Sequence, residues 1–352
     1  MTASASATAQ ADGGLESLLT RGLSGRAAAQ VLAVVPLLAD DLADIDRRID
    51  AVLRASYPQL TEAAVYACGG GGKRVRPLLM AMAQRALGKE TTRPIHSLAA
   101  AFQLIHTASL VHDDVIDRAP TRRGRPSLPR AFGLPTAIVT GDYLFVRAFE
   151  LAAEYPESII LRCGEACADL VEGEVLQDTS RFDLTTGREH YLRVVERKTA
   201  SIMAAALASV AEIAAEPTAQ TDALAAYGRA LGIAFQIRDD LLDVYGDPDL
   251  MGKPLYTDLR EGNPTLLSLE AYAGLDGSRR QEFERRFAVR RKRPGDLLRL
   301  RELIEASGVG EHVAREATRW AERAVRAIES LPASPYHLLL DRAARGAAER
   351  AS

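Results

Sequence analysis

Apolar residues recur at helical spacing along most of this 352-residue chain. Gly, Pro and Asp residues interrupt the pattern, and no convincing alternation of apolar and polar residues indicates a strand. The spacing predicts helices over residues 31–56, 94–111, 142–154, 158–177, 189–216 and 221–244. Many of these segments are rich in Ala and apolar on more than one side, which is typical of central helices. We therefore expect an all-α fold, a single large helical bundle of about ten or more helices.

The first 24 residues differ from the rest of the chain. They are rich in Ala, Ser, Thr and Gly and show little periodicity, so residues 1–24 are expected to form a disordered tail. Residues 25–352 contain no segment with the composition of a linker, and a hydrophobic content of 47% is enough for a large core. We expect one all-α domain over that range.

Charge, cysteine content and hydropathy exclude several classes of protein. A formal net charge of −3 gives no basic surface for nucleic acid. Cys68, Cys163 and Cys167 form no metal-ligand set, and so few cysteines fit a reducing compartment. No apolar run of about eighteen residues occurs, and the start lacks a basic segment followed by an apolar core. The sequence predicts a soluble, cytoplasmic protein with at most transient membrane contact.

Two acid clusters of identical spacing carry the strongest chemical signal. Each holds three aspartates: Asp113, Asp114 and Asp117 in the first acid cluster, and Asp239, Asp240 and Asp243 in the second. Residues four apart share one face of a helix, so the carboxylates of each cluster converge. Like charges at a half-buried surface require a cation, and hard oxygen ligands suit Mg²⁺. A single such motif is more often a helix cap or a solvated face, but the repetition and the apolar flanks disfavour that alternative.

A basic segment follows four consecutive glycines, Gly69–Gly72. Glycine lets the backbone approach an anion closely, and the fork of an Arg side chain matches phosphate oxygens. Lys73, Arg74 and Arg76 therefore predict a phosphate site, although Gly-rich turns with basic residues also serve as ordinary helix connectors.

Six motifs together resemble a known family. In chain order they are Gly71–Pro77, Ile105–Asp114, Thr121–Gly124, Gly141–Leu144, Lys198–Thr199 and Phe235–Asp240. Their order and spacing resemble the all-trans polyprenyl diphosphate synthases, and the resemblance covers roughly residues 40–345. It implies a bundle of the isoprenoid synthase type around a central cavity, a homodimer, and head-to-tail condensation of isopentenyl diphosphate with an allylic diphosphate.

The resemblance also implies roles for single residues. Isopentenyl diphosphate would be bound by Lys73, Arg76, His106 and Arg123, with Arg74 structural. The allylic diphosphate would lie on three Mg²⁺ ions held by Asp113, Asp117 and Asp239, surrounded by Arg122, Lys198, Gln236 and Lys253. Asp114, Asp240 and Asp243 would complete the clusters through water or hydrogen bonds. Thr199 and Gln236 could stabilise a passing carbocation, or could form an ordinary hydrogen bond between helices. His106 and His112 could also be core histidines, the role we favour for His112.

Product length in the resembled family depends on the side chains below the first acid cluster. The positions five and four residues before Asp113 are Ala108 and Ser109, which are both small. A growing tail could pass them along the helix, at about 5.4 Å per turn, so we expect a long chain of about C30–C50. Further candidates for the floor of the pocket are Phe102, Ile105, Phe145 and Phe149. A short-chain geranylgeranyl or farnesyl product stays possible if one of these aromatic rings closes the pocket.

Two positions depart from the family pattern. Asn263 stands where many members have a second Lys, and Gln103 stands where an acid is frequent. Two alternatives from other classes are a class I terpene cyclase and a non-catalytic subunit of a two-component synthase. The repeated DDxxD pattern argues against the cyclase, and the retained acids and cations argue against the non-catalytic subunit.

Overall fold

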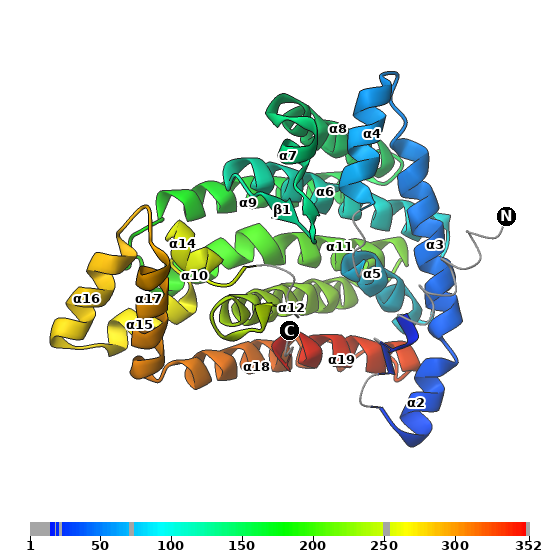
Figure 1. Ribbon diagram of the computed structural model, residues 1–352. Coiled ribbons are helices and arrows are strands. Elements are labelled where there is room, and N and C mark those ends of the chain that lie inside the picture. Colours follow the sequence, from blue (N-terminus) through cyan, green and yellow to red (C-terminus); the bar gives the residue numbers. More distant parts are fainter. Residues whose placement is uncertain (1–14, 18, 21–22, 70–73, 249–253, 350–352) are drawn as a thin grey trace. The chain divides into compact units, whose positions relative to one another are not determined.

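A computed structural model describes residues 15–17, 19–20, 23–69, 74–248 and 254–349 (Figure 1). Within those ranges nearly all regular structure is helical, and this confirms the predicted all-α fold of ten or more helices. Most of the predicted tail over residues 1–24 lies outside the described residues, as do Lys73 and Lys253. No helix in the described ranges is long and apolar enough to cross a membrane.

The helices follow one another along the chain with short connections. The first group is α2 (Gly25–Leu32), α3 (Val35–Val52), α4 (Pro58–Cys68), α5 (Val75–Ala86), α6 (Arg93–Ile116), α7 (Leu128–Phe132) and α8 (Leu134–Ala152). The second is α9 (Glu157–Thr179), α10 (Gly187–Val195), the π turn η1 (Glu196–Ala200), α11 (Ser201–Ile213) and α12 (Thr218–Tyr245). The last is α14 (Thr257–Glu261), α15 (Leu266–Gly274), α16 (Gly277–Phe287), α17 (Pro294–Ser307), α18 (Gly310–Ala327) and α19 (Pro335–Glu349).

Three departures from the predicted helices have local causes. The segment 31–56 divides at Ala33–Val34, because Pro36 begins a new helix, α3, in its first turn. The segment 189–216 stays helical but contains the π turn η1, which apolar spacing does not reveal. A hairpin of two-residue strands, β1 (Thr121–Arg122) and β2 (Arg125–Pro126), was also missed, because such short strands cannot alternate visibly.

Contacts between residues divide the chain into two compact units of discontinuous segments. Unit 1 consists of Met1–Cys163, Ala206–Leu224 and Ile328–Arg342, and unit 2 of Gly164–Ala205, Ala225–Ala327 and Ala343–Ser352. In unit 1, α6 is the central helix: its residues from Ile95 to Ile105 are all buried, and it packs against α3, α5 and α8. In unit 2, a continuous apolar core joins α10, α12, α15, α17 and α18. A half-buried α6 would have had one polar face, so its burial explains why that segment reads as apolar on several sides.

A buried ion pair connects α3 to α5 and α6 within unit 1. Asp41 accepts hydrogen bonds from Arg85 Nε at 2.9 Å and from the Thr91 hydroxyl, and its Oδ1 lies 3.0 Å from His96 Nε2. Burial alone would raise the pKa of Asp41, but the bonds from His96, Arg85 and Thr91 outweigh burial and hold the pKa below 3.8. The folded state therefore favours the charged carboxylate.

We expect Asp41→Asn to lower the free energy of unfolding by about 3 kcal/mol, because Arg85 loses its buried partner. A depressed pKa contributes stability that is present above the unfolded value of 3.8 and is lost as pH falls through the folded value. Urea unfolding should therefore separate wild type and variant widely near neutral pH and less below about pH 4. Asp40→Asn, on the exposed neighbouring residue, is the control. Equal destabilisation by the two variants would contradict this role of Asp41.

Candidate active site

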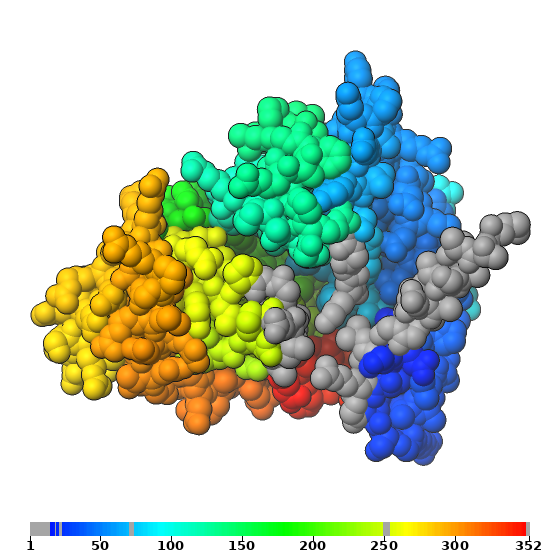
Figure 2. Space-filling view, viewed as in Figure 1, coloured from blue at the N-terminus to red at the C-terminus, as the bar shows by residue number. Residues whose placement is uncertain are grey.

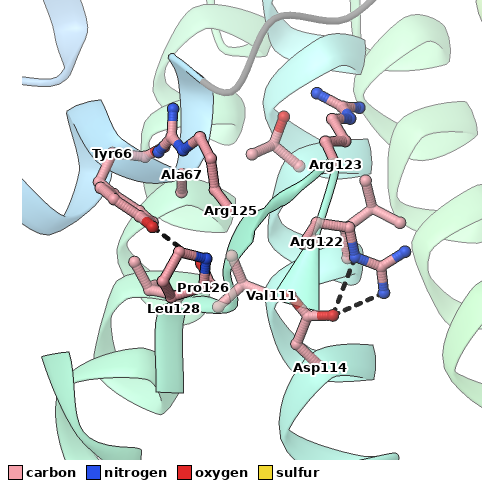
Figure 3. Close-up of a pocket in the computed structure, with 11 residues that line it drawn as sticks. Tyr66, Ala67, Val111, Asp114, Arg122, Arg123, Arg125, Pro126 and Leu128 are labelled. Atoms are coloured by element: carbon pink, nitrogen blue, oxygen red, sulfur yellow. Dashed lines mark hydrogen bonds and ion pairs between the residues drawn. The ribbon is translucent and has the colours of Figure 1, made fainter. Parts of the chain in front are cut away.

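The first acid cluster forms the last turn of α6. Asp113 and Asp117 are half-buried, and the Asp117 amide donates to the Asp113 carbonyl at 2.8 Å, so both belong to one turn. Asp114 is only 3% exposed and accepts two hydrogen bonds on Oδ1, from Arg122 Nε at 2.9 Å and Nη2 at 2.6 Å (Figure 3). Burial raises the pKa of Asp114, against the effect of Arg122. Asp114 thus holds Arg122, while the side chains of Asp113 and Asp117 remain partly exposed.

The second acid cluster occupies the corresponding end of α12, in unit 2. Asp240 is buried and accepts a hydrogen bond from the Tyr191 hydroxyl at 2.6 Å and another from Gln236 Nε2 at 2.8 Å. Burial raises the pKa of Asp240 well above its ordinary value, and the charges of Asp258 and Asp239 raise it further. In both clusters the middle aspartate is therefore bonded to protein groups. Tyr191 was not predicted from the sequence, since no pattern relates it to a residue 49 positions away.

Both acid clusters lie at helix C-termini, where the helix dipole adds negative charge. A cation is favoured there for two reasons: the carboxylates repel one another, and the dipole repels each of them. Within the described ranges, no three His, Cys, Asp or Glu side chains form a ready-made metal cage. Mg²⁺ fits this arrangement, because it is commonly held by one or two carboxylates and completes its shell with water and substrate phosphates.

The π turn η1 carries two of the predicted catalytic residues. Lys198 forms an ion pair with Glu174 of α9. Thr199 Oγ1 donates to Gln236 Oε1 at 3.1 Å, and Gln236 donates in turn to Asp240. A chain of hydrogen bonds therefore links the π turn to the second acid cluster inside unit 2. This is the bond between helices that we kept as the alternative, and the stabilisation of a carbocation by Thr199 and Gln236 stays a prediction.

Two glycines allow the neighbouring helices to approach the π turn closely. A Cβ atom on Gly173 of α9 would lie 2.7 Å from the Lys198 amide nitrogen, and one on Gly232 of α12 would lie 2.7 Å from the Ala200 Cα atom. Both distances are far shorter than a van der Waals contact. The atoms met are backbone atoms, which cannot rotate away as a side chain could. The positions of Lys198 and Thr199 relative to Gln236 therefore depend on the absence of side chains at these two positions.

We expect Gly232→Ala to lower the free energy of unfolding by about 1–3 kcal/mol, because α12 must move away from the π turn. The same movement separates Thr199 from Gln236, so turnover should fall as well. Thermal unfolding and a steady-state assay check the two effects. Gly164→Ala in α9 is the matched control, because a Cβ atom there meets nothing within 4 Å. Wild-type stability and turnover in Gly232→Ala would contradict the packing argument.

In unit 1, a cation cluster is formed by Arg122 and Arg123 of the hairpin together with Arg74, Arg76 and His106. Burial lowers the pKa of Arg76 to about 10, and nearby Arg123 adds to the effect. Burial also lowers the pKa of His106 well below 6.5, with Arg76, Arg123 and Arg122 contributing, so its imidazole is neutral at pH 7. No described carboxylate pairs with Arg76, whose Nε atom is buried without a hydrogen-bond partner. Such unneutralised charge favours binding of a multivalent anion, for which a diphosphate is well suited.

The backbone holds two of these arginines in unfavourable conformations. Arg123 has φ 53° and Gly124 has φ 72°, as a two-residue hairpin turn requires, and Arg74 has φ 43°. The left-handed region costs about 1 kcal/mol or more for an L-residue. Arg74 is also fixed by an ion pair of 3.0 Å with Asp46 and by a hydrogen bond of 3.3 Å to the Cys68 carbonyl. Strain of this kind is concentrated at functional sites.

The sequence profile described as polyprenyl synthetase matches residues 57–304. The chain belongs to the polyprenyl synthetase family. This membership confirms the family predicted from the six motifs and, with it, the assignment to the prenyltransferases.

Individual relatives agree with the family. The chain is 32% identical to the all-trans-nonaprenyl-diphosphate synthase (geranyl-diphosphate specific) of Rhodobacter capsulatus, over 89% of this chain and 96% of the relative. It is 35% identical to the octaprenyl diphosphate synthase of Escherichia coli, over 85% of this chain and 93% of that relative. A solved polyprenyl synthase from Caulobacter crescentus, complexed with calcium and isoprenyl diphosphate, superposes with a TM-score of 0.86 at 36% identity, covering 92% of this chain and 98% of that one.

The residues predicted to set product length in this family member lie on α6 and α8. Phe102, Ile105, Ala108 and Ser109 are all buried on α6. Phe145 and Phe149 are half-buried on α8, which packs along α6. His112 lies near Phe145 with 5.9 Å between the ring centroids, but its side chain is 29% exposed and lies 3.5 Å from Asp142, so it borders the core and is not fully inside it.

Asn263, where many family members have Lys, is buried and turned towards acids. Its Nδ2 atom donates to Asp258 at 3.2 Å and to Glu261 at 3.1 Å. A Lys at this position would place its charge beside the same carboxylates. Asn263 therefore satisfies two acids of α14 by hydrogen bonding.

Proposed function

We propose that this protein is a Mg²⁺-dependent synthase that condenses isopentenyl diphosphate with an allylic diphosphate to give an all-trans chain of about C30–C50. The observation that carries the proposal is the repeated acid cluster at the C-terminal ends of α6 and α12. The product range is supported by the nonaprenyl and octaprenyl synthases among the relatives and by the small residues Ala108 and Ser109.

The two diphosphates require different environments. Isopentenyl diphosphate keeps its diphosphate throughout, so fixed cations are sufficient, and we assign it to Arg76, Arg123 and the neutral His106, with Lys73. A neutral imidazole can donate one hydrogen bond to a phosphate oxygen without adding to the repulsion among the guanidinium groups.

The allylic diphosphate is the leaving group, and negative charge develops on it as the carbon–oxygen bond breaks. Bound Mg²⁺ would neutralise that charge, and the proposed ligands are Asp113, Asp117 and Asp239. Arg122 and Lys198 would add fixed positive charge to the same oxygens. Asp114 orients Arg122 through its two hydrogen bonds.

The resulting allylic cation must meet a carbon nucleophile before it meets water. The double bond of isopentenyl diphosphate attacks the cation, and the new cation then loses a proton to the departing pyrophosphate. Thr199 and Gln236 would turn hydroxyl and amide oxygens towards the passing positive charge. Buried apolar residues of α6 would exclude water from the growing chain.

We also propose a homodimer, with a second copy of the chain on α8. Four large apolar side chains of this helix are between 42% and 55% exposed: Leu134, Ile138, Val139 and Val146. Leu134 and Ile138 are four residues apart, and Val139 and Val146 are seven apart, so each pair lies along one side of the helix. Atoms of the α7–α8 segment, coloured teal, lie at the surface in Figure 2. An exposed apolar stripe of this kind is typical of an interface. A monomer by light scattering at micromolar concentration would contradict the proposal.

The test of function is incubation of the purified protein with labelled isopentenyl diphosphate and one of four primers: dimethylallyl, geranyl, farnesyl or geranylgeranyl diphosphate. Each reaction is run with and without Mg²⁺, and the products are dephosphorylated and sized. We expect Mg²⁺-dependent elongation that ends at a defined length. No elongation from any primer would overturn the proposal and would favour a non-catalytic subunit or a cyclase.

A further inference from the structure

The hairpin that carries Arg122 and Arg123 is attached to unit 1 on both of its strands. On β1, Arg122 is held by Asp114 through bonds of 2.9 and 2.6 Å. On β2, Arg125 and Pro126 are held by Tyr66 of α4 (Figure 3). The residues of this second attachment, Tyr66, Arg125 and Pro126, lie outside the six sequence motifs.

Three interactions make up the second attachment. The Arg125 guanidinium lies 4.0 Å from the centre of the Tyr66 ring, and its Nη2 atom donates to the Tyr66 carbonyl at 3.1 Å. The Tyr66 hydroxyl donates to the Pro126 carbonyl at 2.8 Å. The Tyr66 ring also packs edge to face with Phe132 of α7, at 5.2 Å between centroids. One tyrosine therefore fixes both the backbone and a side chain of β2.

The attachment is also a cap for α4. Tyr66 belongs to the last turn of α4, where backbone carbonyls lack partners within the helix and the dipole is negative. Arg125 caps the Tyr66 carbonyl, and Arg74 caps the Cys68 carbonyl at 3.3 Å. The same helix end leads into the Gly-rich segment that precedes Arg76. Tyr66 thus connects the two stretches of chain that supply the arginines of the cation cluster.

The hairpin needs such an attachment for two reasons. Arg123 is held in the left-handed region at φ 53°, and the positive charges of Arg76 and Arg123 repel each other until an anion binds. Without a restraint, the turn can relax and carry Arg123 away from Arg76. Arg122 has its own restraint in Asp114, so the loss of Tyr66 or Arg125 acts mainly on Arg123.

Arg125 is engaged by Tyr66. The small cavity that it borders is lined by Arg122 and Arg123 as well. The Arg125 guanidinium, however, lies on the Tyr66 ring and donates to the Tyr66 carbonyl. Arg125 therefore acts through the hairpin.

We propose that Tyr66 and Arg125 are positioning residues that hold the hairpin so that Arg123 faces Arg76 before substrate binds. This inference rests on the proposed assignment of isopentenyl diphosphate to Arg76 and Arg123. Its consequence is specific: losing the attachment weakens binding of isopentenyl diphosphate while the chemical step and the allylic substrate are little affected.

The test is the steady-state kinetics of Arg125→Ala and Tyr66→Leu. We expect each variant to raise the KM for isopentenyl diphosphate about tenfold, with kcat and the KM for the allylic diphosphate changed less than about threefold. The double variant should be no worse than the single ones, because either change releases the same attachment. Hydrogen exchange at the amides of residues 121–126 should be faster in both variants and should slow again with saturating isopentenyl diphosphate.

Two controls separate the possible outcomes. Arg130→Ala removes an exposed charge five residues along and should change none of these quantities. Arg76→Ala tests the underlying assignment: an unchanged KM for isopentenyl diphosphate there would overturn the proposed site itself. If Arg76→Ala raises that KM and Arg125→Ala does not, only the positioning role is wrong. A raised KM in Arg125→Ala with wild-type behaviour in Tyr66→Leu would overturn the positioning role too, because Arg125 would then act without Tyr66.

Discussion

Replacing Asp113 by Ala is expected to lower kcat about a thousandfold while the protein stays folded. Asp113 is half-buried at the C-terminal end of α6, and its buried neighbour Asp114 is already occupied by Arg122. The remaining carboxylate of the cluster, Asp117, cannot replace a lost metal ligand. Loss of Asp113 therefore weakens Mg²⁺ binding, and the Mg²⁺ would have neutralised the negative charge that develops on the leaving diphosphate. Asp239→Ala should have a similar effect.

The measurement is a turnover assay at increasing Mg²⁺ concentration, together with circular dichroism to verify folding. Asp222→Ala is the control for Asp239→Ala, because it removes an exposed carboxylate from the same helix, α12. We expect it to retain wild-type turnover. Turnover near the wild-type value in either cluster variant would refute the metal assignment, and loss of folding in Asp113→Ala would show that the carboxylate is structural.

Replacing Ala108 by Phe is expected to shorten the main product by about two or more isoprene units, since one helical turn of about 5.4 Å matches roughly one unit. Ala108 is fully buried and stands between Asp113 and the large side chains of Ile105 and Phe102 on α6. A phenyl ring there would fill the path of the growing chain near its start. Because the site is tightly packed, the same ring should also lower stability by about 1–3 kcal/mol.

A graded series makes this result interpretable. Ala108→Val and Ala108→Leu add less volume and should shorten the product progressively less, while thermal unfolding records the packing penalty of each. If product length does not change along the series, the floor of the pocket lies elsewhere. Phe145→Ala and Phe149→Ala would then be the next variants, and a longer product from either would identify that ring as the floor.

Much of the helical framework could be predicted, because a long helix repeats its spacing of apolar residues over several turns. The predicted segment 94–111 lies within α6, 158–177 within α9 and 221–244 within α12. The need of the acid clusters for a cation could also be predicted, because three carboxylates at this spacing converge on one helical face and repel one another. Sequence spacing can report such local features directly.

Features that depend on distant partners could not be predicted. The sequence places Asp114 and Asp240 among the aspartates that complete the clusters through water or hydrogen bonds, but it does not name their partners, which are Arg122 and Tyr191. The attachment of Tyr66 to Arg125 spans 59 residues. In each case the direction of a side chain is decided by a neighbour that only the folded chain supplies, so local pattern carries no record of it.

The π turn at Glu196–Ala200 makes the geometry of unit 2 sensitive to the length of the chain as well as to its side chains. A π turn contains one residue more than the α-helical path would use. Deleting a single residue there would draw the wider turn back to the α-helical path. Thr199, which the π turn places against Gln236, would then lose that position, although the helices on either side kept their own sequence. Insertions and deletions in this stretch should therefore be far more damaging than most substitutions.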